Sequence, residues 1–152
     1  MNVGDIMTGK PLTVKLDDGV EKIYFIFNTQ HVRHLPVVEK GKMVGFLSDR
    51  DLKKIMPKTA RKVMRTNGKT YSVLENSLPH GALMFMRSNV EGYIVEPLKV
   101  REIMHTEVFT VSPTDDITNA ATLMAEKKIG ALPVLDNGKL VGIVTTTDVL
   151  RG

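Results

Sequence analysis

The sequence predicts a mixed fold of the α+β class (α/β mixed), built from two β-α-β-β-α motifs that face each other about a pseudo-twofold axis. Three observations predict it: an ungapped internal repeat, the same order of β-prone and amphipathic segments in both copies, and a strong hairpin signal in the second copy. An unusually long middle segment separates the two copies.

The internal repeat aligns residues 3–54 with residues 100–151, with roughly fourteen identities in about fifty positions. Its clearest part is "HLPVVEKGKMVGFLSDRD", which begins at His34 and returns as "ALPVLDNGKLVGIVTTTD" from Ala131. A single copy of about 50 residues buries too little surface to be stable alone. We therefore expect one module composed of a first motif (1–54), a connecting segment (55–99) and a second motif (100–152).

Each copy opens with a short β-prone run, residues 12–14 and 109–111, followed by an amphipathic helix. The acidic pairs Asp17/Asp18 and Asp115/Asp116 stand where helix N-caps are expected. Apolar residues then recur at helical spacing, which gives each helix one buried face. These residues are Val20, Ile23 and Phe27 in the first copy, and Ile117, Ala120, Ala121 and Met124 in the second.

A β-hairpin and a final helix complete each copy. "HLPVVE" and "ALPVLD" are mostly apolar and predict buried strands. The turns "EKGK" and "DNGK" follow, and Asn137-Gly138 is a strong two-residue hairpin signal because both positions tolerate positive φ. "MVGFLS" and "LVGIVT" are the returning strands, and an Asp with an apolar run then starts the last helix.

Composition excludes several classes of site. The chain has no cysteine, so disulfides, thiolate catalysis and cysteine-ligated metals are excluded. No stretch approaches the roughly 18 apolar residues of a membrane helix, and the N-terminus lacks a signal core, so we expect a cytoplasmic protein without a membrane partner. A net charge of +4 is a mild bias towards anionic partners.

Both copies end with a hydroxyl and a carboxylate three residues apart, Ser48 with Asp51 and Thr145 with Asp148. One interpretation is a capping box at the start of a helix. The other is a nucleotide site, because a helix N-terminus favours phosphate and a carboxylate can accept hydrogen bonds from ribose hydroxyls. Under that interpretation, the glycine earlier in each strand lets a flat ring approach the backbone. The spacing alone leaves both open.

These motifs resemble the cystathionine β-synthase (CBS) domain, and the tandem pair resembles a Bateman module. The resemblance rests on "DIMT", "HLPVV" and "VGFLSDRDL" in the first copy, and on "EIMH", "ALPVL" and "VGIVTTTDVL" in the second, and it covers about two-thirds of the chain. It implies a regulatory module that binds AMP, ADP, ATP or S-adenosylmethionine in clefts between the motifs and modulates an effector protein through its own conformational change. It also implies a homodimer.

The resemblance assigns two sets of ligand-binding residues. Asp51 and Asp148 are expected to accept from ribose, and Ser48 and Thr145 to lie near the phosphate. Apolar strand residues would sandwich adenine, with Arg50, Arg33 and His34 supplying positive charge. The first set is Ser48, Arg50, Asp51, Val108, Phe109, Ala131 and Pro133, and the second is Pro11, Leu12, Arg33, His34, Pro36, Thr145, Thr147 and Asp148.

Departures from the family pattern leave the number of working clefts open. "TTTD" contains no cation, and Gly130 and Ala131 stand where the first copy has Arg33 and His34. Two sites, one site, or a purely structural dimerisation module with vestigial clefts all remain open. The basic segment 58–69 offers a weaker alternative, a nucleic-acid surface, but it lacks interleaved aromatic residues. Its cations are Lys58, Arg61, Lys62, Arg65 and Lys69.

The middle segment 55–99 is longer than a structureless connection usually is. It is either a helical linker or a decayed partial third copy. For the latter we predict a strand at 71–73, a helix at 78–86, and a strand at 93–95, with Val63 and Met64 matching Ile6 and Met7. Leu83, Met84, Phe85 and Met86 could contribute to a dimer surface or to a core.

We expect neither a metal site nor an enzymatic activity. His31 and His34 lie three residues apart but have no third ligand beside them. The sequence contains none of the common nucleophile, zinc-protease or phosphate-loop motifs. We expect no catalytic cofactor, and the effector protein is not identified by the sequence.

Overall fold

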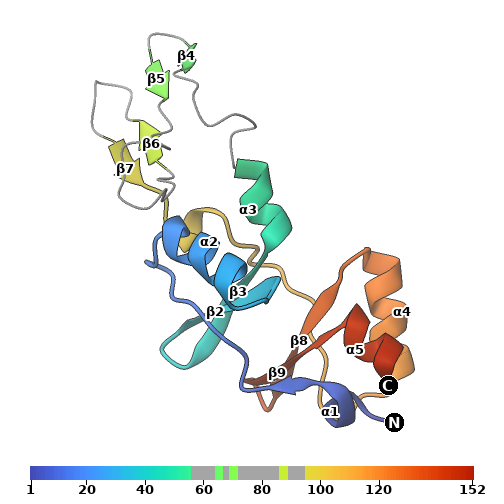
Figure 1. Ribbon diagram of the computed structural model, residues 1–152. Coiled ribbons are helices and arrows are strands. Elements are labelled where there is room, and N and C mark those ends of the chain that lie inside the picture. Colours follow the sequence, from blue (N-terminus) through green and yellow to red (C-terminus); the bar gives the residue numbers. More distant parts are fainter. Residues whose placement is uncertain (56–63, 67–68, 72–85, 89–94) are drawn as a thin grey trace. The chain divides into compact units, whose positions relative to one another are not determined.

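The computed structural model describes residues 1–55, 64–66, 69–71, 86–88 and 95–152 (Figure 1). In chain order its elements are α1 (Val3–Ile6), β1 (Thr8–Gly9), α2 (Val20–Thr29), β2 (His34–Glu39), β3 (Lys42–Ser48), α3 (Asp49–Ile55), β4 (Met64–Thr66), β5 (Lys69–Tyr71), β6 (Met86–Ser88), β7 (Val95–Pro97), the 3₁₀ helix η2 (Val100–Glu102), α4 (Ile117–Lys127), β8 (Ala131–Asp136), β9 (Lys139–Thr145) and α5 (Thr146–Arg151).

The internal repeat is also a structural repeat, because α2-β2-β3-α3 is followed by α4-β8-β9-α5 in the same order. The predicted opening strands are shorter than expected. Each is a single parallel bridge, Val14 with Val37 and Val111 with Val134. The predicted mixed α+β class is confirmed, with a one-residue contact in place of each first strand.

The two hairpins turn as the sequence predicts. β8 and β9 pair antiparallel, and the turn residues Asn137 and Gly138 have φ values of 48° and 80°. Lys40 and Gly41 take similar values, 50° and 77°, between β2 and β3. Two positive φ angles match the twist of antiparallel strands, so the turn fixes the pairing of each hairpin.

The helix caps differ between the copies. Asp116 is the N-cap of α4, and its Oδ1 accepts a hydrogen bond from the backbone N–H of Thr118 at 2.8 Å. This bond holds the pKa of Asp116 below its usual value. In the first copy Gly19 is the N-cap of α2 and no side chain caps it. The N-cap prediction is therefore confirmed at Asp116 only.

The remaining acids of the two pairs have other contacts. Oδ2 of Asp18 accepts from the backbone N–H of Lys15, and Oδ2 of Asp115 accepts from that of Ser112, both at 2.8 Å. Burial alone would raise the pKa of Asp18, but the bond from Lys15 and the ammonium of Lys22 hold it below its usual value. Both acids close the turn that precedes the helix.

The leading segment of each repeat (residues 2–9 and 99–106) pairs with the other repeat. Thr8 and Gly9 in β1 pair with Ile143 and Gly142 in β9, so the second repeat has a three-stranded sheet. At the equivalent place in the first repeat, Phe46 and His105 exchange backbone hydrogen bonds of 3.0 and 2.9 Å. Each repeat thus covers the outer edge of the other's last strand.

The approach of β1 requires a glycine in β9. A Cβ on Gly142 would stand 2.9 Å from the carbonyl oxygen of Thr8 and 2.6 Å from Sδ of Met7. We expected this glycine to admit a ligand ring, but its neighbour is the chain's own first strand.

The chain divides into two compact units. The first consists of Met1–Val14, His34–Leu47 and His105–Gly152. In Figure 1 α5 lies beside α4, and both chain ends lie near α1. A Cβ on Gly152 would stand 2.9 Å from Cγ2 of Ile6. The buried core of this unit is Val3, Val111, Ala120, Met124, Leu132, Val134 and Val144.

The second unit consists of Lys15–Arg33 and Ser48–Met104. Val20 on α2 and Leu52 on α3 are buried, with Leu98 and Ile103 packed against them. Backbone hydrogen bonds join the two segments, from Val20 to the carbonyl of Leu98 at 3.0 Å and from Val100 to that of Asp18 at 2.9 Å.

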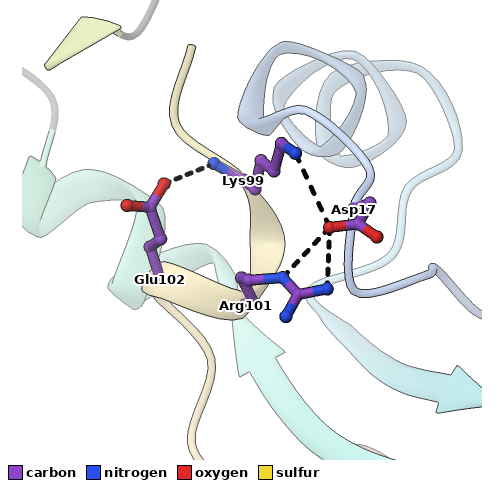
Figure 2. Close-up of polar contacts among 4 residues, drawn as sticks. All are labelled: Asp17, Lys99, Arg101 and Glu102. Atoms are coloured by element: carbon purple, nitrogen blue, oxygen red, sulfur yellow. Dashed lines mark hydrogen bonds and ion pairs between the residues drawn. The ribbon is translucent and has the colours of Figure 1, made fainter. Parts of the chain in front are cut away.

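Exposed charged side chains also join the two segments of the second unit, and we call this contact the charged junction (Figure 2). Nε and Nη2 of Arg101 donate to Oδ1 of Asp17 at 3.0 and 2.8 Å, and the ammonium of Lys99 lies 3.7 Å from the same oxygen. Oδ1 of Asp17 therefore holds both cations beside the turn that leads into α2. Glu102 accepts from the backbone N–H of Lys99 at 3.0 Å.

The middle segment forms two short antiparallel pairs, β4 with β5 and β6 with β7. Met86 lies in β6, so the predicted helix does not extend to it. Tyr71 lies in β5 and Val95 in β7, while the rest of the predicted strands at 71–73 and 93–95 falls outside the described residues. Other predictions also fall outside the described residues. They concern the basic residues Lys58, Arg61 and Lys62, Val63, the rest of the predicted helix (78–85), and the possible dimer residues Leu83, Met84 and Phe85.

Two cations of the basic segment 58–69 lie in described strands, Arg65 in β4 and Lys69 in β5.

Among the described helices, none is long and apolar enough to cross a bilayer.

Truncation of Leu132 tests the core of the first unit. Leu132 is 0% exposed, so Leu132→Ala leaves a cavity and should lower the free energy of unfolding by about 2–5 kcal/mol. Leu150, which is 87% exposed, is the matched control, and Leu150→Ala should change it by less than about 0.5 kcal/mol. Urea unfolding followed by circular dichroism measures both. Equal effects would contradict the assigned core.

A double-mutant cycle with Asp17→Asn and Arg101→Gln tests the charged junction. Both side chains are about half exposed or more, at 64% and 48%, so water screens the pair and the coupling energy should not exceed about 1 kcal/mol. Urea unfolding of the four proteins should show the coupling disappearing in about 1 M NaCl. A coupling that resists salt would contradict an exposed pair.

Candidate functional site

The second repeat ends in a capping box at the start of α5. The backbone N–H and the hydroxyl of Thr145 both donate to Oδ2 of Asp148, at 2.8 and 2.7 Å. The backbone N–H of Asp148 donates back to the Thr145 hydroxyl at 3.2 Å. Two of these bonds fix the carboxylate, and the third ties the Asp148 backbone to the Thr145 side chain. Among the described residues, no donor contacts its other oxygen, Oδ1.

The first repeat ends in the same way. The backbone N–H and hydroxyl of Ser48 donate to Oδ2 of Asp51 at 2.8 and 3.1 Å. Asp51 is only 8% exposed. The capping-box interpretation is therefore correct for Thr145 and Asp148, whereas Ser48 and Asp51 form the half of the box in which the acid accepts. The box at Asp148 does not exclude a ligand, because a carboxylate has a second oxygen with its own lone pairs.

A backbone bond joins each helix start to the segment that leads into the buried strand of the same repeat. The N–H of Thr146 donates to the carbonyl of Gly130 at 3.0 Å, and the N–H of Asp49 donates to that of Arg33 at 2.9 Å. The Arg33 and Gly130 positions thus lie beside the hydroxyl-and-acid motif of their own repeat.

His34 makes an aromatic contact within the first unit. Its ring stacks on that of Phe46, with centroids 5.8 Å apart and an interplanar angle of 10°. A Cβ on Gly130 would stand 3.7 Å from Cε1 of His34. Gly130 accepts a hydrogen bond from Thr146, so His34 lies near the residue that holds the start of α5. Phe46 has no role in the sequence prediction.

The predicted apolar contacts differ widely in exposure. Pro36, Pro133 and Ala131 are buried, whereas Leu12 and Phe109 are 47% and 46% exposed. The exposed pair offers the most side-chain area to a ligand. Val108 and Pro11 are half-buried, and Arg33, Arg50 and Thr147 are exposed.

A residue absent from the predicted sets lies on Phe109. The ammonium of Lys127, the last residue of α4, stands over the Phe109 ring, 5.1 Å from its centroid. Such a cation–π contact cannot be read from residues that are far apart in sequence.

The structure places most of the second predicted set in one unit. Pro11, Leu12, His34, Pro36, Thr145, Thr147 and Asp148 all belong to the first unit, and Arg33 belongs to the second. The first predicted set draws on both units and remains a prediction of the resemblance. Among the described residues, no group of three or more His, Asp or Glu side chains is arranged to hold a metal ion.

A comparison with models of known protein families identifies the family of this chain. The CBS domain model matches residues 3–58 and 100–152. The chain belongs to the CBS-domain family. It contains two CBS domains in tandem, the organisation that its repeat predicts. The resemblance seen in the motifs is thus confirmed.

Two proteins match the chain over nearly its full length. Protein MJ1426 of Methanocaldococcus jannaschii is 30% identical over 159 residues, which cover 99% of this chain and 90% of that protein. CBSX2, crystallised in complex with AMP, is 27% identical, with a TM-score of 0.68 over 99% of this chain and 93% of CBSX2.

A third match supports the fold alone. The CBS domain pair of protein MJ0100, crystallised with 5′-methylthioadenosine and S-adenosyl-L-methionine, is 23% identical. Its TM-score is 0.69, over 99% of this chain and 98% of that chain.

Removal of the Thr145 hydroxyl tests the capping box of the second CBS domain. Thr145→Val removes the acceptor of the Asp148 N–H and one donor to its carboxylate, so the free energy of unfolding should fall by about 1 kcal/mol. Thr147→Val is the matched control, because Thr147 is exposed in the same turn. Chemical unfolding measures both. A cost no larger than that of Thr147→Val would show that the box is not formed in solution.

Proposed function

We propose that this CBS pair is a regulatory module that binds an adenosine-type ligand, with AMP as the first candidate. The observation that carries the proposal is the fixed carboxylate of Asp148, which has an oxygen that no donor contacts among the described residues. The AMP complex of CBSX2, a relative of 27% identity, supports the choice of ligand class.

Asp148 is suited to the ribose. Its Oδ2 is committed to Thr145, so the carboxylate keeps one orientation without a ligand, and Oδ1 can accept from a ribose hydroxyl. A hydrogen bond to a charged acceptor is stronger than a neutral one. Little orientational freedom is then lost on binding.

We assign the hydroxyl roles differently from the resemblance, on the basis of the hydrogen bond of Thr145. Thr145 uses its single proton in the bond to Asp148, so it cannot also donate to a phosphate. Thr147 is exposed in the first turn of α5, and we assign to it the donation that the resemblance gives to Thr145. Arg33 and His34 supply positive charge in this proposed set, and Leu12 offers exposed apolar area to the base.

Ligand binding would act on a partner through a change in conformation. A ligand shifts an equilibrium between two arrangements only by its difference in affinity for them. The proposed set combines residues from both CBS domains, so a ligand there would favour the arrangement in which they meet. The effector protein and the predicted homodimer are part of this proposal.

Isothermal titration of the full chain with AMP, ADP, ATP and S-adenosylmethionine tests the proposal. We expect AMP to bind more tightly than about 1 mM. Asp148→Asn should weaken it by about tenfold, because an amide oxygen is a poorer acceptor for ribose than a carboxylate. Asp51→Asn tests the first predicted set in the same way.

Asp136→Asn is the matched control, since Asp136 is exposed at the end of β8 and makes a described contact only with its neighbour Asn137. It should leave every affinity unchanged. Absence of binding below about 1 mM for all four ligands would overturn the proposal and leave a structural dimerisation module with vestigial clefts.

A further inference from the structure

The contact between Lys127 and Phe109 is a feature that the proposed function does not use. Phe109 is 46% exposed, and the Lys127 ammonium lies 5.1 Å from its ring centroid. An aromatic face attracts a cation through its quadrupole. The ring therefore restrains an otherwise flexible ammonium group, which is also exposed to solvent.

The two repeats have basic residues at different aligned positions. The first repeat has Arg33 and His34 before its buried strand, and the second has Gly130 and Ala131 at those positions. At the position of Lys127 the first repeat has Gln30. The second repeat thus lacks basic residues at the positions of Arg33 and His34, and it has Lys127 shortly before them.

The aromatic ring that Lys127 contacts is also specific to the second repeat. Phe109 aligns with Leu12, an aliphatic residue of nearly equal exposure. A leucine offers no aromatic face to an ammonium group. The ring and the cation therefore occur together in the second repeat, and neither occurs in the first, although both repeats expose apolar area at this position.

From this juxtaposition we infer that Lys127, held by Phe109, is the residue with which the second repeat recognises the anionic tail of its ligand. The inference rests on the proposed function and adds the ligand class, adenosine phosphates rather than S-adenosylmethionine. An ammonium has three donors, and contact with a ring face leaves donors for phosphate oxygens. The C-terminal end of α4 also favours a cation at this position.

The charge of the ligand decides the selectivity. The phosphate of AMP is attracted to Lys127, whereas the tail of S-adenosylmethionine has a net positive charge, because its sulfonium and ammonium groups together outweigh its one carboxylate. Lys128, the next residue, adds a second positive charge near the same helix end. The second repeat therefore disfavours a cationic tail next to Phe109.

Titration of the full chain with AMP and with S-adenosylmethionine tests this inference. The Asp148→Asn background weakens the other predicted set, so the measured affinity reports the site that includes Phe109. In that background Lys127→Gln should weaken AMP by about tenfold and leave S-adenosylmethionine unchanged or tighter. The ratio of the AMP affinity to the S-adenosylmethionine affinity should fall by at least about the same factor.

Two further variants separate recognition from structure. Lys127→Arg keeps the cation and the ring contact, so AMP should bind within about threefold of the background affinity. Lys139→Gln removes one exposed positive charge from the β8–β9 hairpin and should change neither affinity. Thermal unfolding followed by circular dichroism checks that all variants are folded.

Three results would overturn the inference. The first is an unchanged AMP affinity in Lys127→Gln, and the second is an equal loss for both ligands. The third is AMP binding to the wild type that disappears in the Asp148→Asn background, which would leave the proposed function intact. If the wild type binds none of the adenosine compounds, the proposed function fails together with the inference.

Discussion

The hydrogen bonds between each leading segment and the last strand of the other repeat are the constraint on which the rest of the structure depends. A strand edge left open has unpaired N–H and C=O groups. β1 covers the edge of β9, and His105 covers that of β3 at Phe46. Gly142 is needed because a Cβ there would stand 2.9 Å from the carbonyl oxygen of Thr8 in β1. These pairings tie the two repeats into one module, which single copies of about 50 residues need for stability.

One pair of side chains in each repeat stabilises the start of the last helix and, in our proposal, also binds the ligand. In each repeat the acid bonds the backbone N–H and hydroxyl three residues earlier, and this starts the last helix. The two interpretations left open by the sequence are therefore not exclusive. The bonds that satisfy the helix end also hold a carboxylate in one orientation. Stability and recognition would then depend on the same hydrogen bonds, so substitution of the acid alters both.

Features governed by local chemistry could be predicted from the sequence. The hairpin at Asn137 and Gly138, the cap at Asp116 and the order of helices and strands follow from positive φ, from capping and from periodicity. The caps expected at Asp17 and Asp18 were wrong, because the helix starts after Gly19 and the carboxylate of Asp18 closes the turn before it. Contacts between distant positions gave no local signal. Lys127 over Phe109, His34 on Phe46 and the neighbour of Gly142 all required the tertiary structure.

Because the exchange of leading segments is reciprocal, the order of the two repeats along the chain does not matter to their pairing. Gly152 lies against Ile6, so a short peptide could join the ends while the chain is opened between the repeats. Such a circular permutant would keep every strand pair described for β1, β3, β8 and β9. The entropic cost of a longer connection also rises only with the logarithm of its length. This topology therefore tolerates a connection as long as residues 55–99, since the repeats recognise each other through their own strand edges.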